Sequence, residues 1–143
     1  MMAQTARLER QIHKQTAQRI SAKIEAAIQS SRKMLEWADD WDEEGSKKFE
    51  AATWKRAVQW LRATARAFHR LQGVWIEPPR ILPGPEGSID IHWKHAGREL
   101  LVNFPENAAE PVEYYGRGSA SDVIKGKLDS AQASAWVLVW LKK

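Results

Sequence analysis

The chain has 143 residues, of which 43% are apolar, and a formal net charge of +4. This length accommodates one hydrophobic core and is short for two, so we expect a single domain over residues 1–143. The absence of cysteine excludes disulfides, a thiol nucleophile and thiolate metal ligands, and favours a cytoplasmic location. The longest apolar run, Ala135 to Leu141, is far shorter than the roughly 20 residues that span a bilayer, so no membrane attachment is expected.

Positive and negative residues fall in separate segments of the chain. Residues 1–33 carry a net charge of +5, residues 34–50 carry −5 and residues 51–80 carry +5, while the remainder is nearly neutral. Neighbouring helices of opposite charge usually compensate one another within a fold. The basic segments therefore indicate the sign of a partner's charge and do not identify the partner.

The first element expected is a long helix over residues 5–38, which contain no glycine or proline. A helix of about 34 residues would be about 50 Å long, whereas a globule of this size is roughly 30 to 35 Å wide. The helix is therefore expected to break near residues 15–16 or to project. Leu8 and Ile12 point away from its apolar stripe, so residues 1–15 are predicted to form an arm that binds a partner or a symmetry mate. The stripe consists of Ala17, Ile20, Ile24, Ala27, Ile28, Leu35 and Ala38.

A second helix is predicted over residues 50–71, antiparallel to the first because a tight acidic turn joins them. Trp60 lies at the edge of its apolar face, where it is expected to be partly exposed, and Gly73 ends the helix. An exposed tryptophan beside arginine is typical of a protein-binding surface. The apolar face comprises Trp54, Ala57, Val58, Leu61, Ala65, Phe68 and Leu71.

Arg62, Arg66 and Arg70 lie with Lys55 on the opposite face of this helix. Arginines about one turn apart are spaced to contact the phosphates of a nucleic acid. The same face has no aromatic residue for base stacking, and the sequence contains no helix-turn-helix or RNA-binding motif. A solvated face, or one that docks on a carboxylate-rich protein, is the better interpretation.

The pattern then changes from helical to alternating. Strands are expected at residues 89–93, 100–104, 112–115 and 123–128. The first two form an antiparallel hairpin about the turn at residues 95–98. In the last strand the even-numbered residues face the core, whereas Lys125 and Lys127 face outward.

The C-terminal segment predicts a helix that begins at Asp129 or Ser130 and ends at Leu141. Trp136 and Trp140 share one face, and the helix is apolar nearly all round, so it is expected to be buried on more than one side. The order of elements predicts an α+β fold with two N-terminal antiparallel helices, a small antiparallel sheet of about four strands, and a buried C-terminal helix.

The loop between the first two helices, residues 39–46, matches part of a calcium-binding loop. Asp40, Asp42 and Glu44 occupy its positions one, three and five. Position twelve, which requires a bidentate glutamate, is Ala51. We predict no metal site here and interpret the loop as a solvated connection whose carboxylates offset the basic helices.

Few residues suggest catalysis. Asp90 and His92 share the outward face of one strand, and Glu113 and Tyr115 share that of another, which leaves open a carboxylate–histidine pair across the sheet. The sequence contains no G-x-S-x-G motif and no histidine spacing typical of a metal site. It predicts no catalytic residue, no metal, no cofactor and no small-molecule substrate.

Several sequence blocks resemble a family of small, uncharacterised bacterial proteins. The blocks are WDEEGS at 41–46, PRILPGPEGSIDIHW at 79–93, ELLVNFP at 99–105, YYG at 114–116 and KGKLD at 125–129. They lie mostly in expected turns and strand cores, which is typical of a folding pattern. The resemblance implies a cytoplasmic, single-domain bacterial protein with a family-like core over residues 37–141, and it supplies no activity or catalytic residue.

The sequence therefore favours a non-enzymatic protein-binding module, such as an antitoxin, an immunity protein or an accessory of a bacterial defence system. The expected ligand is a protein partner or a second copy of the chain. Nucleic-acid binding through the basic face of helix 50–71 is the alternative, and an undetected enzyme is the third. The predicted partner-binding residues are Leu8, Ile12, Trp60, Arg62, Arg66 and Arg70.

Overall fold

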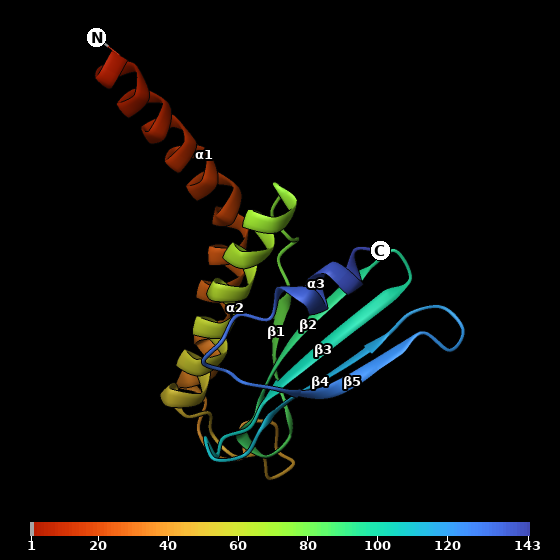
Figure 1. The fold of residues 1–143 in the computed structure, drawn as a ribbon. Helices are drawn as coiled ribbons and strands as arrows, with labels where there is room; N and C mark the ends of the chain where they lie inside the picture. Colours follow the sequence, from red (N-terminus) through yellow and green to blue (C-terminus); the bar gives the residue numbers. More distant parts are fainter. Residues whose placement is uncertain (1) are drawn as a thin grey trace.

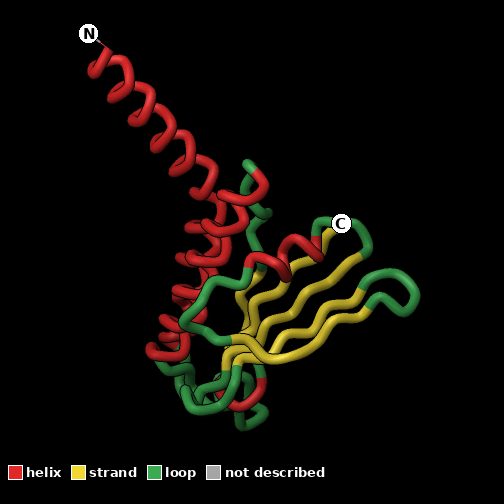
Figure 2. The backbone as a smooth tube through the Cα atoms, in the orientation of Figure 1, coloured by secondary structure: helices red, strands yellow, loops and turns green. Residues whose placement is uncertain are grey.

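The computed structural model describes the backbone of residues 2–143 and the side chains of residues 3–11 and 21–143. Its helices and antiparallel sheet confirm the predicted α+β class (Figures 1 and 2). The helical elements are α1 (Met2–Ser31), the 3-10 helix η1 (Arg32–Glu36), α2 (Ala51–Gln72), the 3-10 helix η2 (Pro85–Gly87) and α3 (Ala135–Leu141). The strands are β1 (Arg80–Pro83), β2 (Ile89–His95), β3 (Arg98–Phe104), β4 (Val112–Arg117) and β5 (Val123–Leu128).

The five strands form one antiparallel sheet in the order β1-β2-β3-β4-β5, so every strand pairs with its neighbour in sequence. The predicted hairpin, third strand and fourth strand correspond to β2 to β5. β1 was not expected, because its four residues end at Pro83 and follow Pro79. Proline lacks the N–H that a central strand needs but is tolerated at an edge, which is where β1 lies.

The helices cover one face of this sheet (Figures 1 and 2), because α1 contacts β1, α2 contacts β2 and β3, and α3 contacts both α2 and β3. Residues such as Ile91 and Val102 alternate toward the helices and are fully buried, whereas their sequence neighbours face the opposite side. Gly116 of β4 is part of this packing, since a Cβ there would lie 2.7 Å from side-chain atoms of both Ile124 and Trp140.

α1 is continuous, so the break expected near residues 15–16 is absent from its backbone, and the N-terminal part of the helix extends beyond α2 and the sheet (Figure 1). The helix ends earlier than predicted, at Ser31, and the chain continues as η1. The Ser31 hydroxyl donates to the carbonyl of Ile28 (2.6 Å) and accepts a bond from the indole N–H of Trp54 (2.8 Å). These bonds fix the end of α1 against α2.

α2 closely matches its predicted bounds and ends at Gly73, whose positive φ of 73° suits glycine and whose N–H bonds to the His69 carbonyl. Two expectations about its surface are wrong. Trp60 is 1% exposed, because the sheet packs under a wider part of α2 than the apolar stripe indicated, and its ring contacts Phe104 with centroids 5.6 Å apart. Leu71, in the last turn, is 67% exposed.

α3 is buried as predicted, with Val137, Leu138 and Leu141 fully enclosed. It begins at Ala135 rather than at residues 129–130, because the Asp129 carboxylate accepts a bond from the N–H of Ala131 and forms a turn there instead of capping a helix. Trp136, expected to face inward, is 50% exposed and is therefore a correction to the predicted core.

Candidate functional site

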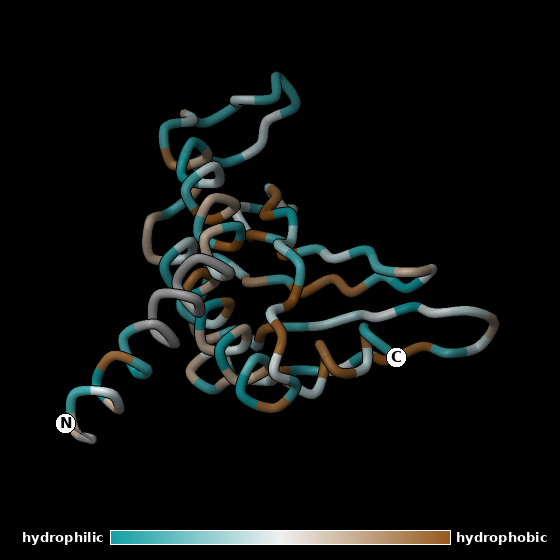
Figure 3. The backbone as a smooth tube through the Cα atoms, turned by 90° about the horizontal axis from the view of Figure 1, so that it is seen from above, coloured by the Kyte–Doolittle hydropathy of each residue, from teal (hydrophilic) through white to brown (hydrophobic). Residues whose placement is uncertain are grey.

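The N-terminal part of α1 is the most exposed helical segment among the described residues. The side chains of residues 3–11 are all exposed, and Leu8 is 59% exposed. Viewed from above, this end of α1 lies apart from the sheet, with the N-terminus and C-terminus on opposite sides of the molecule (Figure 3). Leu8 is therefore exposed on this part of α1, whereas the Ile12 side chain lies outside the described residues.

Arg62, predicted to contact a partner, bonds to α1 of its own chain. Its Nε and Nη2 donate to Oε1 and Oε2 of Glu25, and each bond is 2.8 Å long. These hydrogen bonds lower the pKa of Glu25, partial burial opposes the shift, and the charges of Arg62 and Arg66 add to it. Arg62 therefore connects two helices, which reduces the basic surface that α2 offers to a ligand.

Arg66 and Arg70 remain exposed on α2, one helical turn apart, as the sequence predicted. Arg56, nearer the start of α2, bonds to the β3–β4 loop, since its Nη2 donates to the carbonyls of Pro105 (2.6 Å) and Glu106 (3.1 Å). The six predicted partner-binding residues consequently form no single patch among the described side chains. Leu8 lies on the projecting helix, Trp60 in the core, Arg62 between two helices, and Arg66 and Arg70 on the α2 surface.

The acidic loop is held closed by its own hydrogen bonds. Oδ1 of Asp40 accepts from the N–H of Gly45 (2.6 Å), and Oδ1 of Asp42 accepts from the N–H groups of Glu44 (3.0 Å) and Ser46 (3.3 Å). The Ser46 hydroxyl also bonds to Asp42, and these bonds lower the pKa of the Asp42 carboxyl. The carboxylates therefore stabilise the turn, and the described part of the chain contains no group of three or more His, Asp or Glu arranged to hold a metal.

The helix-free face of the sheet carries a polar cluster that the sequence did not predict as a unit. The Asn103 amide donates to Oγ of Ser88 (2.9 Å) and to Oδ1 of Asp90 (2.7 Å). Burial raises the pKa of Asp90, while the Asn103 bond and the nearby His92 oppose the rise. Alternation placed Asp90 on this face, but the partners Ser88 and Asn103 depend on strand register, which the sequence patterns did not define.

His92 does not pair with Glu113, the carboxylate that the sequence left open as its partner, because Glu113 lies across from Asn103 and Lys127; His92 joins a surface ion-pair network with Glu99 instead. Nε2 of His92 lies 3.5 Å from Oε1 of Glu99, and the same carboxylate contacts Lys94 (3.5 Å) and Arg117 (3.1 Å). Burial favours protonation of Glu99, but Lys94, Arg117 and His92 together outweigh this effect and hold the pKa of the Glu99 carboxyl below its usual range. Glu99 thus contacts three basic side chains on the sheet surface, from β2 and β4.

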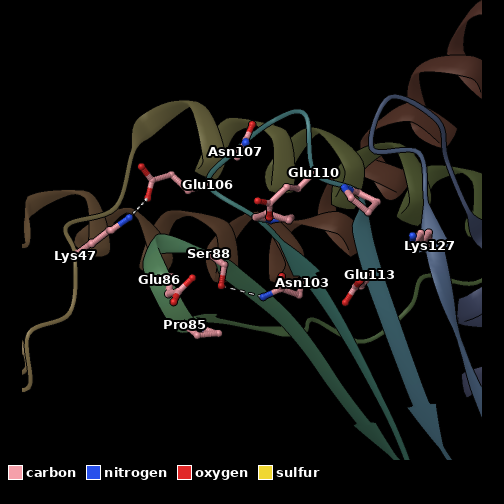
Figure 4. Close-up of a pocket in the computed structure, with 12 residues that line it drawn as sticks. Lys47, Pro85, Glu86, Ser88, Asn103, Glu106, Asn107, Glu110, Glu113 and Lys127 are labelled. Atoms are coloured by element: carbon pink, nitrogen blue, oxygen red, sulfur yellow. Dashed lines mark hydrogen bonds and ion pairs between the residues drawn. The ribbon is translucent and has the colours of Figure 1, made fainter.

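Two shallow grooves adjoin the polar cluster. One has a volume of about 620 Å³ and lies between the polar cluster and the β3–β4 loop (Figure 4). Its side chains combine both charges, and Lys47 and Glu106 approach to 3.9 Å across it. The second, of about 510 Å³, follows β3, β4 and β5 and includes Leu101 and Tyr115. The grooves share Asn103, Glu113 and Lys127. Open grooves that follow strands in this way fit an extended segment of another molecule better than an enclosed small ligand.

Comparison with protein families, curated proteins and solved structures finds no match. The resemblance to uncharacterised bacterial proteins, carried by blocks between residues 37 and 141, therefore stays a prediction. Within the part of the chain that the structure describes, no helix has both the length and the apolar character needed to cross a bilayer. The surfaces that could bind another molecule are the N-terminal part of α1, the basic face of α2 and the helix-free face of the sheet.

Proposed function

We propose that this protein is a non-enzymatic protein-binding module of a bacterial cell that acts as an antitoxin, an immunity protein or a defence-system accessory. The observation that carries the proposal is the projecting part of α1, in which residues 3–11 are exposed and Leu8 is 59% exposed. Cytoplasmic location belongs to the same proposal. Binding requires no catalytic group, which agrees with the structural roles of the carboxylates at Asp42 and Glu99.

Residues 3–11 of α1 gain little stability from packing, because their side chains are all exposed. Short helices without tertiary packing are marginal in water, because nucleation is costly and each residue adds little. A partner surface that covers Leu8 would contribute roughly 1.5 to 3 kcal/mol from that side chain. Arg7 and Arg10 are exposed beside it, and residues 1–33 carry a net charge of +5. The partner surface is therefore acidic, since opposite charge steers association.

Nucleic-acid binding is the second candidate, supported by the exposure of Arg66 and Arg70 one turn apart on α2. Spaced arginines on a helix can follow a phosphate backbone. The engagement of Arg62 by Glu25 removes one of the cations that this candidate requires. The protein partner is therefore the proposal that the surface supports better.

The test compares proteins captured by the tagged full chain, by Leu8→Arg and by Ala6→Arg. Residue 6 lies about 160° around the helix from residue 8, so Ala6→Arg adds the same charge to the opposite face. We expect a captured protein to be lost with Leu8→Arg and kept with Ala6→Arg, and the purified pair to bind at least about tenfold more weakly after the first change.

Two results would contradict the proposal. Equal affinity of a purified partner for both variants would show that Leu8 contributes nothing. A partner that dissociates on nuclease treatment would favour the nucleic-acid candidate instead. Sedimentation of the full chain and of Leu8→Arg distinguishes a second copy from a different protein, because only self-association depends on the concentration of this chain alone.

A further inference from the structure

β5 forms one edge of the sheet. Its residues Val123–Leu128 pair with β4, and among the described residues no strand pairs with the other side of β5. An edge strand presents backbone N–H and C=O groups that can bond to an added strand. The opposite edge differs, because β1 contacts α1.

The register defines which residues of β5 present these groups. Gly118 lies opposite Asp122, one position beyond the pair of Arg117 and Val123, and its N–H donates to the Asp122 carbonyl (2.7 Å). Gly118 and Asp122 are therefore a hydrogen-bonded pair. Directly opposed residues of antiparallel strands alternate between hydrogen-bonded and non-bonded pairs. Val123, Lys125 and Lys127 are therefore the residues of β5 that form no backbone hydrogen bonds with β4. The backbone groups of these three residues point away from β4, toward the free edge.

The same three residues project their side chains from the helix-free face. Val123, Lys125 and Lys127 are exposed, whereas Ile124 and Gly126 are half-buried on the other face. Residues of an added strand that pair with Lys125 and Lys127 would lie on the face of the lysines, with Cα atoms about 5.5 Å away. Position along the added strand thus determines which of its side chains meet positive charge.

The charge of this edge indicates its occupant. A second copy of β5 would place lysines opposite lysines, and edge lysines commonly prevent such pairing between identical strands. Lys127 has Glu113 as its cross-strand neighbour in β4, while Lys125 lies across from Tyr115. An added strand with acidic residues at alternate positions would complement both lysines, and most directly Lys125.

The helix-covered side of the edge offers an apolar contact. Gly126 has no side chain, and a Cβ there would lie 2.8 Å from the hydroxyl oxygen of Tyr114. The Tyr114 ring packs against Trp136 in an edge-to-face arrangement, with centroids 5.2 Å apart. Trp136 remains 50% exposed. An apolar side chain beside Gly126 would cover part of this aromatic pair.

We propose that the free edge of β5 binds an extended acidic peptide segment as a sixth strand. Its acidic residues occupy alternate positions beside Lys125 and Lys127, and an apolar residue between them contacts Tyr114 and Trp136. Backbone bonds provide affinity and the alternating side chains provide specificity. The inference rests on the proposed function in taking a protein segment as ligand, but it uses a surface separate from Leu8.

The probe is a capped synthetic peptide of nine residues with glutamate at two alternate positions, valine between them and threonine elsewhere. Amide hydrogen exchange of the full chain, followed by NMR, reports each backbone N–H. We expect slower exchange at Val123, Lys125 and Lys127 and little change at Ile124 and Gly126, whose N–H groups already bond to β4. Protection elsewhere, or none at these three amides, would overturn the proposal.

Charge reversal tests the specificity. We expect the double variant Lys125→Glu with Lys127→Glu to bind the peptide at least about tenfold more weakly and to bind a matched lysine peptide more tightly. Lys94→Glu, on the same face but on β2, is the matched control and should keep most of the affinity. Equal peptide binding by all three chains would contradict the proposal. Retention of fold is checked by the exchange pattern of β2 and β3.

The proposals for the arm of α1 and for the edge of β5 can be tested separately. Leu8→Arg should leave peptide binding unchanged, because the arm does not contact β5. If the peptide does not bind while Leu8→Arg still loses the captured partner, the edge proposal is wrong and the arm proposal stands. If the peptide binds while Ala6→Arg and Leu8→Arg capture the same proteins, the arm proposal is wrong and the edge proposal stands.

Discussion

Arg62 of α2 and Glu25 of α1 form a bidentate ion pair, with both N–O distances at 2.8 Å. The pair lies next to Ile24, which is 3% exposed, so it marks the part of α1 that packs on the globule. The Arg62 side chain that the sequence assigned to a partner therefore connects the two helices. Arg66, one turn further along α2, remains exposed, and its charge also lowers the pKa of Glu25.

The first prediction concerns the strength and pH dependence of this pair. The Glu25 side chain is 42% exposed, so solvent screening limits its contribution to roughly 0.5 to 1 kcal/mol. Because the pKa of Glu25 is lowered in the folded state, this stabilisation is present above the ordinary glutamate pKa and is lost as pH falls through the lowered value. Glu25→Gln should therefore destabilise the protein at neutral pH and have little effect in acid.

Urea unfolding of Glu25→Gln, Arg62→Lys and the double variant measures the coupling. Arg62→Lys keeps the charge but cannot donate two parallel bonds to one carboxylate. Additive effects of the two changes at neutral pH would show that the bidentate geometry of Arg62 contributes nothing beyond its charge.

Asp90 should show the opposite pH dependence. Burial raises its pKa in the folded state, so the folded protein binds more protons than the unfolded chain between the two pKa values. The stabilisation that protonation provides is present below the ordinary aspartate pKa and is lost as pH rises through the raised value. Asp90→Asn removes the charge and keeps an oxygen that accepts from Asn103.

We therefore expect Asp90→Asn to equal or exceed the unmodified chain in stability at neutral pH, with the difference shrinking in acid. Thermal unfolding between about pH 3 and pH 7, a range that spans ordinary carboxyl titration, measures this. Asp42→Asn is the comparison, because hydrogen bonds lower the pKa of that carboxyl and its pH dependence should have the reverse sign. A stability loss at Asp90→Asn that grows with pH would refute the assignment.

The predictable parts of the fold are those with strong local periodicity. The apolar stripe of α2 and the alternation in β2 and β3 predicted which faces of these elements are buried. Leu61 and Ile91, for example, are both 0% exposed. β1 was missed because its four residues carry too little alternation and its pairing depends on β2. The late start of α3 reflects the turn at Asp129, and Ser134 at its beginning also bonds through its N–H to Thr64 Oγ1, a contact distant in sequence.

Trp60 and Trp136 provide a paired test of the corrected core. Trp60 is 1% exposed, so Trp60→Ala leaves a large cavity and should cost about 3 to 5 kcal/mol of unfolding free energy. Trp136 is 50% exposed, and Trp136→Ala should cost clearly less. Urea unfolding with tryptophan fluorescence measures both. Equal costs would contradict the placement of Trp136 at the surface.

The candidate surfaces were only partly accessible to sequence patterns. A helix wheel identified Leu8 as out of phase with the packed stripe, and alternation placed Lys125 and Lys127 outward, since both inferences need only local geometry. The edge position of β5 and the Arg62–Glu25 pair required strand order and helix packing, which local periodicity does not encode. For this reason the sequence assigned Arg62 to a partner, although in the structure its guanidinium bonds to Glu25 of the same chain.

The last prediction separates protein from nucleic-acid binding by salt. If α2 contacts phosphates, affinity for duplex or single-stranded DNA or RNA should fall steeply between about 50 and 200 mM salt, because each contact releases condensed counterions. Arg66→Ala with Arg70→Ala should then flatten the slope by about one unit per contact, while Arg62→Ala should change it less, since Glu25 already binds that guanidinium. Our leading proposal expects no measurable binding at about 50 mM salt, where phosphate contacts are strongest. A steep slope that responds to Arg66 and Arg70 but not to Lys125→Glu would instead assign the basic face of α2 to nucleic acid and favour the second candidate function.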